Sequence, residues 1–322
     1  MKKQPRILVV GSLVMDLIVS TPRFPNAGET VLGLDYSTAS GGKGANQAVQ
    51  AARLGAQVTM VGRVGNDDFG RAMVRSVSAA GVNTDHILVT EDACSAIGNI
   101  QLETDGVHTQ NRIIVVSGAN MKITPEDVAF LKDDIKNYDL VIMQFEIPMA
   151  INELVAKYAY EAGVPVMVNT APSAPIDNEE FLSHITYISP NEHEAYDLTG
   201  ITITDDATTR AAVDNLLSRG VKNVIITCGE RGAAYGSPDT FLMSPCVPCE
   251  KVADPTAAGD SFIGAFCTAK SSGVSVEEAL LFANCTAHIT VSRMGAQPSM
   301  PMLSEVLALM KEKGFDTTPY ES

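Results

Sequence analysis

Short apolar runs alternate with helical patterns along most of this chain, and this alternation limits the fold more than any other feature. The helical patterns end at glycines such as Gly55 and Gly81. Continuous apolar strands joined through helices are typical of a parallel sheet covered on both faces. The sequence therefore predicts an α/β fold whose ligands bind beyond the carboxyl ends of the strands. The predicted strands lie in RILVVGS, QVTMVGRVG, DLVIMQFE, VPVMVNTAP, ITYISP and VKNVIITCG.

Two segments depart from this alternation. NIQLETDGVHTQNRIIVV alternates apolar and polar residues around Thr104-Asp105-Gly106, which is typical of a hairpin with a tight turn. Residues 20–40 have the composition of loops and half-buried strands. We expect these pieces to form a small second sheet that acts as a lid. Residues 1–322 are thus predicted to be a single domain, with lid segments at about 12–40 and 95–116 and a frayed C-terminal tail.

The acidic balance of the chain limits its partners. The formal net charge of −15 argues against nucleic acid and against an anionic membrane surface. No apolar run is long enough for a membrane span, and the N-terminal apolar run is too short for a secretory signal. The six scattered cysteines do not form the pattern of a disulfide framework, so we expect a cytoplasmic protein.

Three turns are candidate ligand loops, and each has a structural alternative. SGGKGANQAVQAARLGA places Lys43 and several glycines before a helix, where a backbone can approach an anion, but a tight turn without a ligand explains the same residues. TCGERGAAYG follows a strand and is equally the pattern of a hairpin turn. PNEHEA puts Asn191 and Glu194 at a helix start, where N-capping alone would account for them.

The stretch DPTAAGDSFIGAF is more specific. Ala257, Ala258 and Gly259 are predicted to leave their N–H groups free at a helix start, which is an anion-binding arrangement. Asp260 in the same turn could accept a proton from a hydroxyl held beside that anion, as phosphoryl transfer requires. One such N–H donor contributes about 2.7–4 kcal/mol to a transition state. An acid that only complements the helix dipole contributes about 0.3–1 kcal/mol, and this alternative does not explain the small residues before Asp260.

The remaining metal-binding residue types do not form a recognisable site. Cys246 and Cys249 make one CxxC pair without a second pair, so we expect a structural role rather than zinc binding. His193 and His288 have no partners at ligand spacing and are expected to be ordinary packing or surface residues.

Together these motifs resemble the two signature regions of the ribokinase-like (PfkB) sugar kinases. The likeness covers nearly the whole chain and includes FPNAGET, GANMKITPEDV, MQFEIP, NTAPSAP, ITCGERG and RMGAQPSMP. Within the family the chain is most similar to pentose kinases of the ribokinase and deoxyribokinase type. The resemblance implies a three-layer fold, with a mostly parallel central sheet, helices on both faces and a small β-sheet lid. It also implies an ATP-dependent kinase for the 5-hydroxyl of D-ribose or 2-deoxy-D-ribose, with Mg²⁺ and K⁺ as cofactors.

The resemblance assigns roles to residues at matching positions, and it implies a homodimer through the lids. The catalytic residues would be Asp260 as the base, with Ala257, Ala258 and Gly259 as the anion hole. The sugar would be held by Asp16, Gly42, Lys43, Asn46 and Glu146. ATP would be held by Asn191, by Thr227, Gly229 and Gly232 of the 227–232 turn, by Gly259, and by Asn284 at the adenine. The metal positions would be Glu194, for Mg²⁺ through water, and Asp254, Thr256, Thr290, Arg293, Gly295 and Ser299, for K⁺.

One position departs from the family pattern. Ribokinases carry an asparagine two residues before the sugar-binding aspartate, whereas this chain has Val14 before Asp16. Valine cannot hydrogen bond to a sugar hydroxyl, and an unpaired buried hydroxyl costs about 1–3 kcal/mol. Val14 therefore favours a sugar without a 2-hydroxyl, although Asp16, Lys43 and Asn46 could still satisfy ribose. A kinase for a nucleoside or another sugar, and a non-catalytic sugar- or nucleotide-binding protein, stay open as alternatives.

Overall fold

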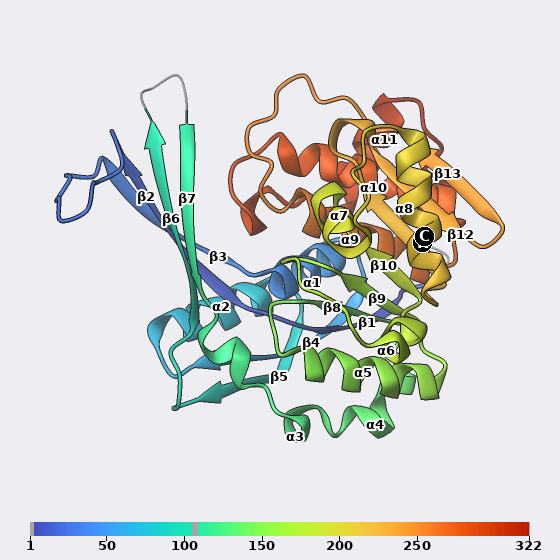
Figure 1. Cartoon of the computed structure of the whole chain (residues 1–322), viewed down its shortest axis with the longest axis horizontal. Helices are drawn as coiled ribbons and strands as arrows, with labels where there is room; N and C mark the ends of the chain where they lie inside the picture. The colour runs from blue at the N-terminus through green and yellow to red at the C-terminus, as the bar shows by residue number, and fades with distance from the viewer. Residues whose placement is uncertain (1–2, 105–108, 322) are drawn as a thin grey trace.

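The centre of the molecule is a nine-stranded sheet, seen in a computed structural model that describes residues 3–104 and 109–321 (Figure 1). The strand order is β13-β12-β11-β10-β9-β8-β1-β4-β5. Neighbours from β11 to β5 pair in parallel, and β12 and β13 add an antiparallel edge. The bounds are β1 (Arg6–Val10), β4 (Gln57–Gly65), β5 (Asn83–Thr90), β8 (Leu140–Gln144), β9 (Val166–Asn169), β10 (Tyr187–Ser189), β11 (Asn223–Thr227), β12 (Ala233–Ser237) and β13 (Thr240–Ser244).

The predicted parallel sheet is confirmed, and β1 shows why its strands are apolar throughout. Ile7 and Val9 belong to one hydrophobic core, whereas Leu8 and Val10 belong to the other. Successive side chains of a strand point to opposite faces, so a strand buried on both faces needs apolar residues at every position. The antiparallel edge was not predicted, and the TCGERG turn is indeed the connection of the β11–β12 hairpin.

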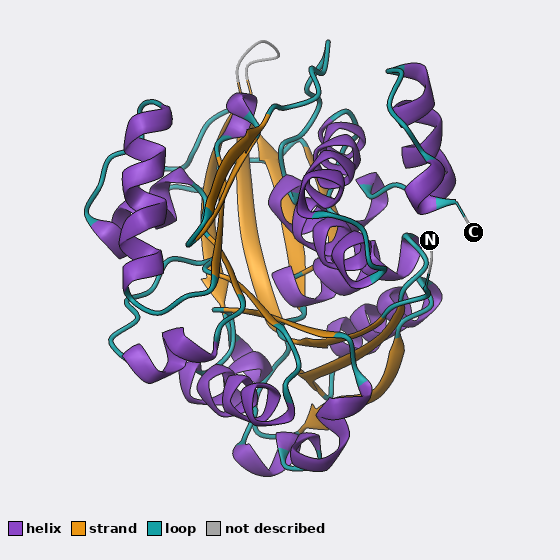
Figure 2. Ribbon diagram, turned by 90° about the vertical axis from the view of Figure 1, so that its right-hand side faces the viewer, coloured by secondary structure: helices purple, strands orange, loops and turns teal. Residues whose placement is uncertain are grey.

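Helices pack on both sides of the strands (Figure 2). No helix among the described residues is long and apolar enough to cross a membrane. The core that contains Ile7 is covered by α1 (Lys43–Arg53), α2 (Asp68–Ala79), α9 (Ala258–Ser271), α10 (Val276–Val291) and α11 (Leu303–Glu312). The core that contains Leu8 is covered by α3 (Pro125–Val128), α4 (Leu131–Asp134), α5 (Met149–Ala162), α6 (Glu179–His184), α7 (Glu192–Thr199) and α8 (Asp206–Ser218). Short 3-10 helices are η1 (Gly118–Lys122), η2 (Ile135–Asn137), η3 (Gly229–Arg231), η4 (Gln297–Ser299) and η5 (Thr318–Tyr320).

A smaller sheet projects from one side of the main body (Figure 1). Its antiparallel pairs β3–β2 and β6–β7 are joined by a parallel β2–β6 pair. The predicted second sheet is confirmed; its role as a lid stays a prediction, and Asp105 and Gly106 of the predicted turn lie outside the described residues. β3 ends at Gly41, just before α1 begins at Lys43, so the small sheet leads directly into that helix. The bounds are β2 (Val14–Thr21), β3 (Asp35–Gly41), β6 (Ala96–Thr104) and β7 (Thr109–Val116).

The C-terminal segment is ordered by one aromatic side chain, so the expectation of a frayed tail is wrong. Tyr320 is only 1% exposed and stacks on Phe282, with ring centroids 4.7 Å apart. Its hydroxyl donates to the carbonyl of Glu278 at 2.7 Å. Burial of a large ring outweighs the chain entropy that would otherwise free a polar terminus.

Candidate active site

A cavity of about 190 Å³ lies at the carboxyl ends of β9, β10 and β11, where a parallel sheet is expected to bind ligands. These ends contribute Asn169, Ser189 and Thr227, and the first turn of α9 lies opposite. The sequence analysis did not predict Asn169 and Ser189 as site residues. Their positions at the ends of predicted strands could have indicated them. The lining residues are Lys43, Asn169, Ala171, Ser189, Asn191, Glu194, Thr227, Pro255, Ala257, Ala258, Gly259, Asp260 and Ile263.

The first turn of α9 offers unpaired backbone N–H groups to this cavity. Ala257 precedes the helix with φ 60° and ψ 11°, a left-handed conformation that non-glycine residues rarely adopt. No side chain caps the helix, and the N–H groups of Ala257, Gly259 and Asp260 have no hydrogen-bond partner among the described residues. The prediction of a free N–H on Ala258 is wrong: the turn at Ala257 brings this N–H to the carbonyl of Pro255, at 3.2 Å.

Asp260 lies in the same turn, and both of its carboxylate oxygens are held by amides from α1. Asn46 Nδ2 donates to Oδ2 and Gln47 Nε2 donates to Oδ1, each at 2.9 Å, and Asp260 is only 7% exposed. The two helices pack closely because Gly264 has no side chain; a Cβ there would lie 2.9 Å from the Gln47 carbonyl oxygen. The sequence analysis missed Gln47, although it directly follows Asn46 in the GANQ motif.

Lys43 adds a positive charge to the cavity. Burial acts to lower the pKa of its ammonium group, but the carboxylates of Asp260, Glu146 and Glu194 outweigh burial, and the pKa is raised. Lys43 is therefore protonated at neutral pH and faces the same space as the N–H groups of α9. The positive groups that line this cavity are thus the Lys43 ammonium and the backbone N–H groups of α9, beside the carboxylates of Asp260 and Glu194.

Asn191 and Glu194 open α7 with a reciprocal capping box. Asn191 Oδ1 accepts from the Glu194 N–H at 2.8 Å, and Glu194 Oε2 accepts from the Asn191 N–H at 3.0 Å. Glu194 Oε2 also accepts from the Thr170 hydroxyl at 3.1 Å. The capping interpretation of PNEHEA is thus correct, and both side chains line the cavity as well.

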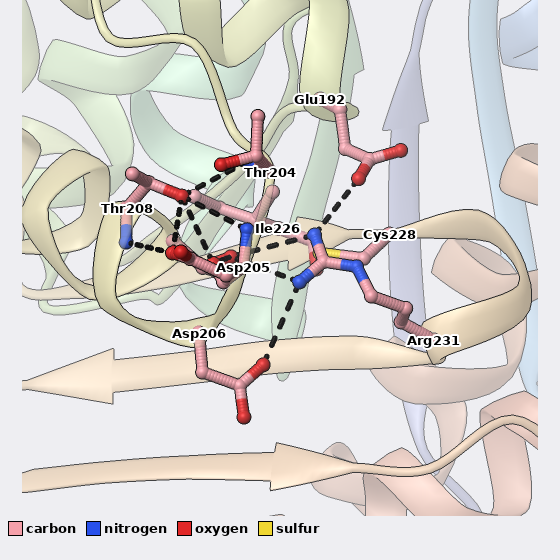
Figure 3. A network of polar contacts seen from close by, with 9 residues as sticks. Glu192, Thr204, Asp205, Asp206, Thr208, Ile226, Cys228 and Arg231 are labelled. Atoms are coloured by element: carbon pink, nitrogen blue, oxygen red, sulfur yellow. Dashed lines mark hydrogen bonds and ion pairs between the residues drawn. The ribbon is translucent and has the colours of Figure 1, made fainter.

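The turn after β11 is held by Arg231, whose guanidinium reaches the first turns of α7 and α8 (Figure 3). One nitrogen donates to Glu192 at 2.9 Å and another lies 3.5 Å from Asp206. Of the three residues predicted here to hold ATP, Thr227 lines the cavity, whereas Gly229 and Gly232 do not belong to its described lining. Gly232 has φ 90° and lies against the end of β13, where a Cβ would be 2.1 Å from the Ser244 carbonyl oxygen.

Residues predicted to hold the sugar gather at the start of α1. Glu146 accepts from the Ser12 hydroxyl at 2.5 Å and from the Lys43 N–H at 2.9 Å, so it caps the helix. Gly42 precedes the helix, and a Cβ on it would lie 2.7 Å from the Val14 nitrogen. Asn46 donates its Nδ2 hydrogen to Asp260, which leaves a buried Oδ1 without a partner in the part of the chain described. A hydroxyl donor of a ligand would satisfy this oxygen.

Asp16 and Val14 lie on one face of β2, next to this helix start. A Cβ on Gly41 or on Gly98 would lie within 2.9 Å of the Asp16 carboxylate, so both glycines make room for it. Burial, and then the charge of Glu146, raise the pKa of Asp16 to about 6. Val14 is 6% exposed, and its Cγ1 would lie 3.9 Å from a Cβ on Gly98, on the side of Asp16.

The family model described as "pfkB family carbohydrate kinase" matches residues 4–303. The chain belongs to the pfkB family of carbohydrate kinases. It is similar to the ribokinase of Bacillus subtilis (41% identical; 94% of this chain and 99% of the relative) and to that of Schizosaccharomyces pombe (40% identical; 93% and 96%). The structure of Arabidopsis thaliana ribokinase complexed with ribose and ATP matches with a TM-score of 0.89 at 36% identity, over 96% of this chain and 99% of that one. The predictions of the family, of the three-layer fold and of a sugar kinase are confirmed.

The cation loop predicted for this kinase is organised by Asp254. Its Oδ1 accepts from the Thr256 N–H and its Oδ2 from the Gly295 N–H, each at 2.9 Å. Burial acts to raise the pKa of Asp254, but the hydrogen bonds from Thr256 and Gly295 outweigh burial and lower it. The Thr290 hydroxyl lies 2.6 Å from that of Ser261, the residue after Asp260. The loop is therefore tied to α9.

The side chains of two other residues of the predicted cation loop already have hydrogen-bond partners in the protein. The guanidinium of Arg293 donates to Glu305 at 2.6 Å, and the Ser299 hydroxyl donates to Ala296 at 2.7 Å. The carbonyl oxygens of Arg293 and Gly295 accept no hydrogen bond from the described residues. The main chain, rather than these side chains, is what this turn offers to a cation.

Asn284 does not belong to the described lining of the cavity, and its side chain binds the main chain at the end of β13. Its Nδ2 donates to the Ser244 carbonyl at 3.2 Å and to the Pro245 carbonyl at 3.1 Å. The predicted adenine contact of Asn284 therefore stays a prediction. In the structure, the Asn284 side chain positions this segment through its hydrogen bonds. Cys246 and Cys249, which follow, each donate a thiol to a nearby carbonyl, and no metal-binding group of three His, Cys, Asp or Glu occurs in the described residues.

Proposed function

We propose that this kinase transfers the γ-phosphoryl group of ATP to the 5-hydroxyl of a pentose, either D-ribose or 2-deoxy-D-ribose. The observation that carries the proposal is the carboxylate of Asp260, oriented by two amides beside a cavity lined with unpaired N–H groups. The relatives named ribokinases, one of them solved with ribose and ATP, support this choice of substrates.

Phosphoryl transfer divides the work between Asp260 and the first turn of α9. Asp260 accepts the proton of the sugar hydroxyl while the hydroxyl oxygen bonds to phosphorus and the bond to the departing ADP oxygen breaks. The N–H groups of Gly259 and Asp260 and the ammonium of Lys43 stabilise the charge on the transferred phosphoryl oxygens. Little covalent chemistry is needed from the protein, so positioning and charge supply most of the rate.

Mg²⁺ fits this site through water rather than through a direct carboxylate ligand. Glu194 Oε1 accepts from Asn191 Nδ2, and Oε2 accepts from the Asn191 N–H and from Thr170. These bonds leave Glu194 best suited to orient the hydration shell of a cation. The buried Ser189 hydroxyl lines the cavity and has no partner among the described residues. It could hydrogen bond to a water molecule of that hydration shell. The metal would neutralise phosphate charge.

K⁺ fits the loop around Asp254 because the unpaired carbonyl oxygens of Arg293 and Gly295 are hard donors of the type such cations take. A cation there would fix the backbone from Asp254 to Ala257 and so hold the anion-binding turn. We therefore propose a monovalent-cation activator that does not contact the reacting atoms.

Because of Val14, we expect 2-deoxyribose to be at least as good a substrate as ribose. Its buried side chain lies on the Asp16 face of β2 and offers no hydrogen bond to a 2-hydroxyl. An unpaired hydroxyl costs about 1–3 kcal/mol, which is roughly a factor of ten to a hundred in kcat/KM. We expect Val14→Asn to shift the ratio of kcat/KM values toward ribose. A wild type that strongly prefers ribose, with no shift in Val14→Asn, would remove Val14 as the discriminator.

The function is tested by coupled ADP release over a panel of pentoses, deoxypentoses, hexoses and nucleosides. We expect turnover with ribose and 2-deoxyribose, and a loss of at least ~10² in kcat in Asp260→Asn with nucleotide binding retained. Preference for a nucleoside or a hexose would replace the pentose assignment. No turnover with any acceptor would favour the non-catalytic alternative.

We further propose that the kinase is a cytoplasmic homodimer whose small sheets pack on each other. The edge strand β7 exposes Ile113, Ile114, Val115 and Val116, and an apolar edge strand that stays unpaired invites aggregation. A second copy would cover this surface. The six cysteines are all free, as suits a reducing compartment.

A further inference from the structure

We infer that Gln47 is a positioning residue that fixes the carboxylate of Asp260, in an orientation set by a chain of buried amides. The inference rests on the proposed role of Asp260 as the base. Gln47 is fully buried, and its Nε2 donates one proton to Asp260 Oδ1 at 2.9 Å and the other to Asn169 Oδ1 at 3.2 Å. Its Oε1 accepts from Gln144 Nε2 at 2.7 Å. Both donor hydrogens of this amide are used, and its oxygen accepts one hydrogen bond.

A main-chain carbonyl sets the direction of these hydrogen bonds. Asn169 Nδ2 donates to the Ser189 carbonyl at 2.9 Å, and a carbonyl can only accept. Asn169 Oδ1 must then face Gln47, and the Gln47 amide must present its NH₂ group to both Asn169 and Asp260. An inverted amide would oppose an oxygen to two acceptors and place its NH₂ group against that of Gln144. The backbone of β10 therefore specifies the donor that meets the base.

Gln144 is a buried polar residue that fits this part of the core at a cost. A Cβ on Gly11 would lie 2.1 Å from its Oε1, so the side chain fits only beside a glycine. Gln144 Oε1 is buried and has no partner in the described chain, and an unsatisfied buried acceptor lowers stability. Stability therefore does not explain this glutamine, whereas its donation to Gln47 does.

The expected effect of losing Gln47 falls on turnover rather than on ATP binding. Asp260 would keep one hydrogen bond, from Asn46, and its carboxylate could rotate away from the sugar hydroxyl. A displacement of roughly 1 Å at a reacting group costs on the order of 10²-fold in rate. Gln47 does not belong to the described lining of the cavity, so the KM for ATP should change little.

Gln47→Glu separates positioning from packing, because it keeps the shape and the bond from Gln144 but replaces the donating NH₂ by an oxygen. Gln50→Glu is the matched control: Gln50 is also fully buried on α1, its Nε2 donates to the Pro301 carbonyl, and its Oε1 accepts from the Ser261 hydroxyl, a bond that Gln50→Glu keeps. Gln47→Glu sets an oxygen against two buried acceptors, one of them the Asp260 carboxylate, whereas Gln50→Glu sets one against a single carbonyl, so the melting temperature should fall further in Gln47→Glu. We expect Gln47→Glu to lower kcat by at least ~10-fold relative to Gln50→Glu, with the KM for ATP within about threefold of wild type.

Gln47→Met, which removes the donor without adding charge, gives the same measurement if Gln47→Glu does not fold. Wild-type kcat in the folded Gln47 variant, or an equal loss of kcat in Gln50→Glu, overturns the inference. Asp260→Asn distinguishes this failure from that of the proposed function. If Asp260→Asn keeps its turnover, the role of the base is wrong; if it is inactive while the Gln47 variants are normal, only the positioning role is wrong.

Discussion

Gly259→Ala should stabilise the protein and remove its activity in a single change. Gly259 lies in the first turn of α9 and lines the cavity, and a Cβ built on it meets no neighbouring atom within 4 Å. The new methyl group therefore fits the fold without displacing any protein atom. It would project into the open space where the transferred phosphoryl group is proposed to lie.

The two effects of Gly259→Ala have opposite signs and different sizes. Alanine in place of glycine inside a helix stabilises by about 0.5–1 kcal/mol, because the unfolded chain has less freedom to lose. In a chain of this length that corresponds to a rise of at most about 2 °C in the melting temperature. The methyl group would hold the phosphoryl oxygens away from the N–H groups of Gly259 and Asp260. Removing one such donor costs about 10²–10³ in kcat.

The assay pairs a thermal melt of Gly259→Ala with coupled ADP release at saturating ATP and pentose. Isothermal titration with ADP checks that the variant still binds the product nucleotide, which lacks the transferred group. Turnover within about threefold of wild type would refute the reasoning, because the phosphoryl group would then not approach Gly259. A marked loss of stability would also contradict it, since the structure leaves room for the methyl group.

Asp16 is protonated below about pH 6 and then loses an acceptor for sugar hydroxyls. The KM for pentose should rise as the pH falls through that value in wild type and stay flat in Asp16→Asn; a flat wild-type profile would exclude Asp16 from sugar binding. Exchange of K⁺ for Na⁺ at constant ionic strength should lower kcat, and an unchanged rate would contradict the cation site at Arg293 and Gly295. Light scattering at micromolar concentration should give the mass of a dimer for wild type and of a monomer for Ile114→Asp, which changes an exposed β7 residue. A monomeric wild type would rule out the interface between small sheets.

The parts of the fold that depend on local patterns could be predicted from the sequence. The strand QVTMVGRVG has the predicted bounds, Gln57–Gly65, because its valines and methionine stand between a helix that ends at Gly55 and the next helical pattern. The TCGERG turn could not be decided in the same way. Its glycines suit a ligand loop and a hairpin equally well, and only the pairing of β11 with β12 shows the antiparallel edge.

The site was less accessible to sequence reasoning because its contacts join distant segments. Gln47 and Asp260 are 213 residues apart, and their hydrogen bond depends on the close packing of α1 against α9 at Gly264. The pairing of the Ala258 N–H depends on a left-handed φ at Ala257, which an alanine gives no reason to expect. The DPTAAGD motif pointed to Asp260 and the family resemblance to Asn46, but neither carried information about what holds these side chains in place.

The direct run from β3 into α1 joins two parts of the molecule that can be altered separately. The small sheet carries Val14 and Asp16, which are proposed to bind the sugar, whereas the strand ends with Asn169 and Thr227 line the cavity that is proposed to take the transferred group. The start of α1 is shared, since Lys43 reaches that cavity. Evolution can therefore exchange the acceptor by altering β2, β3 and β6 while the cavity stays constant. Grafting the small sheet of a relative onto this chain, with α1 left intact, is a practical route to a kinase for a new sugar.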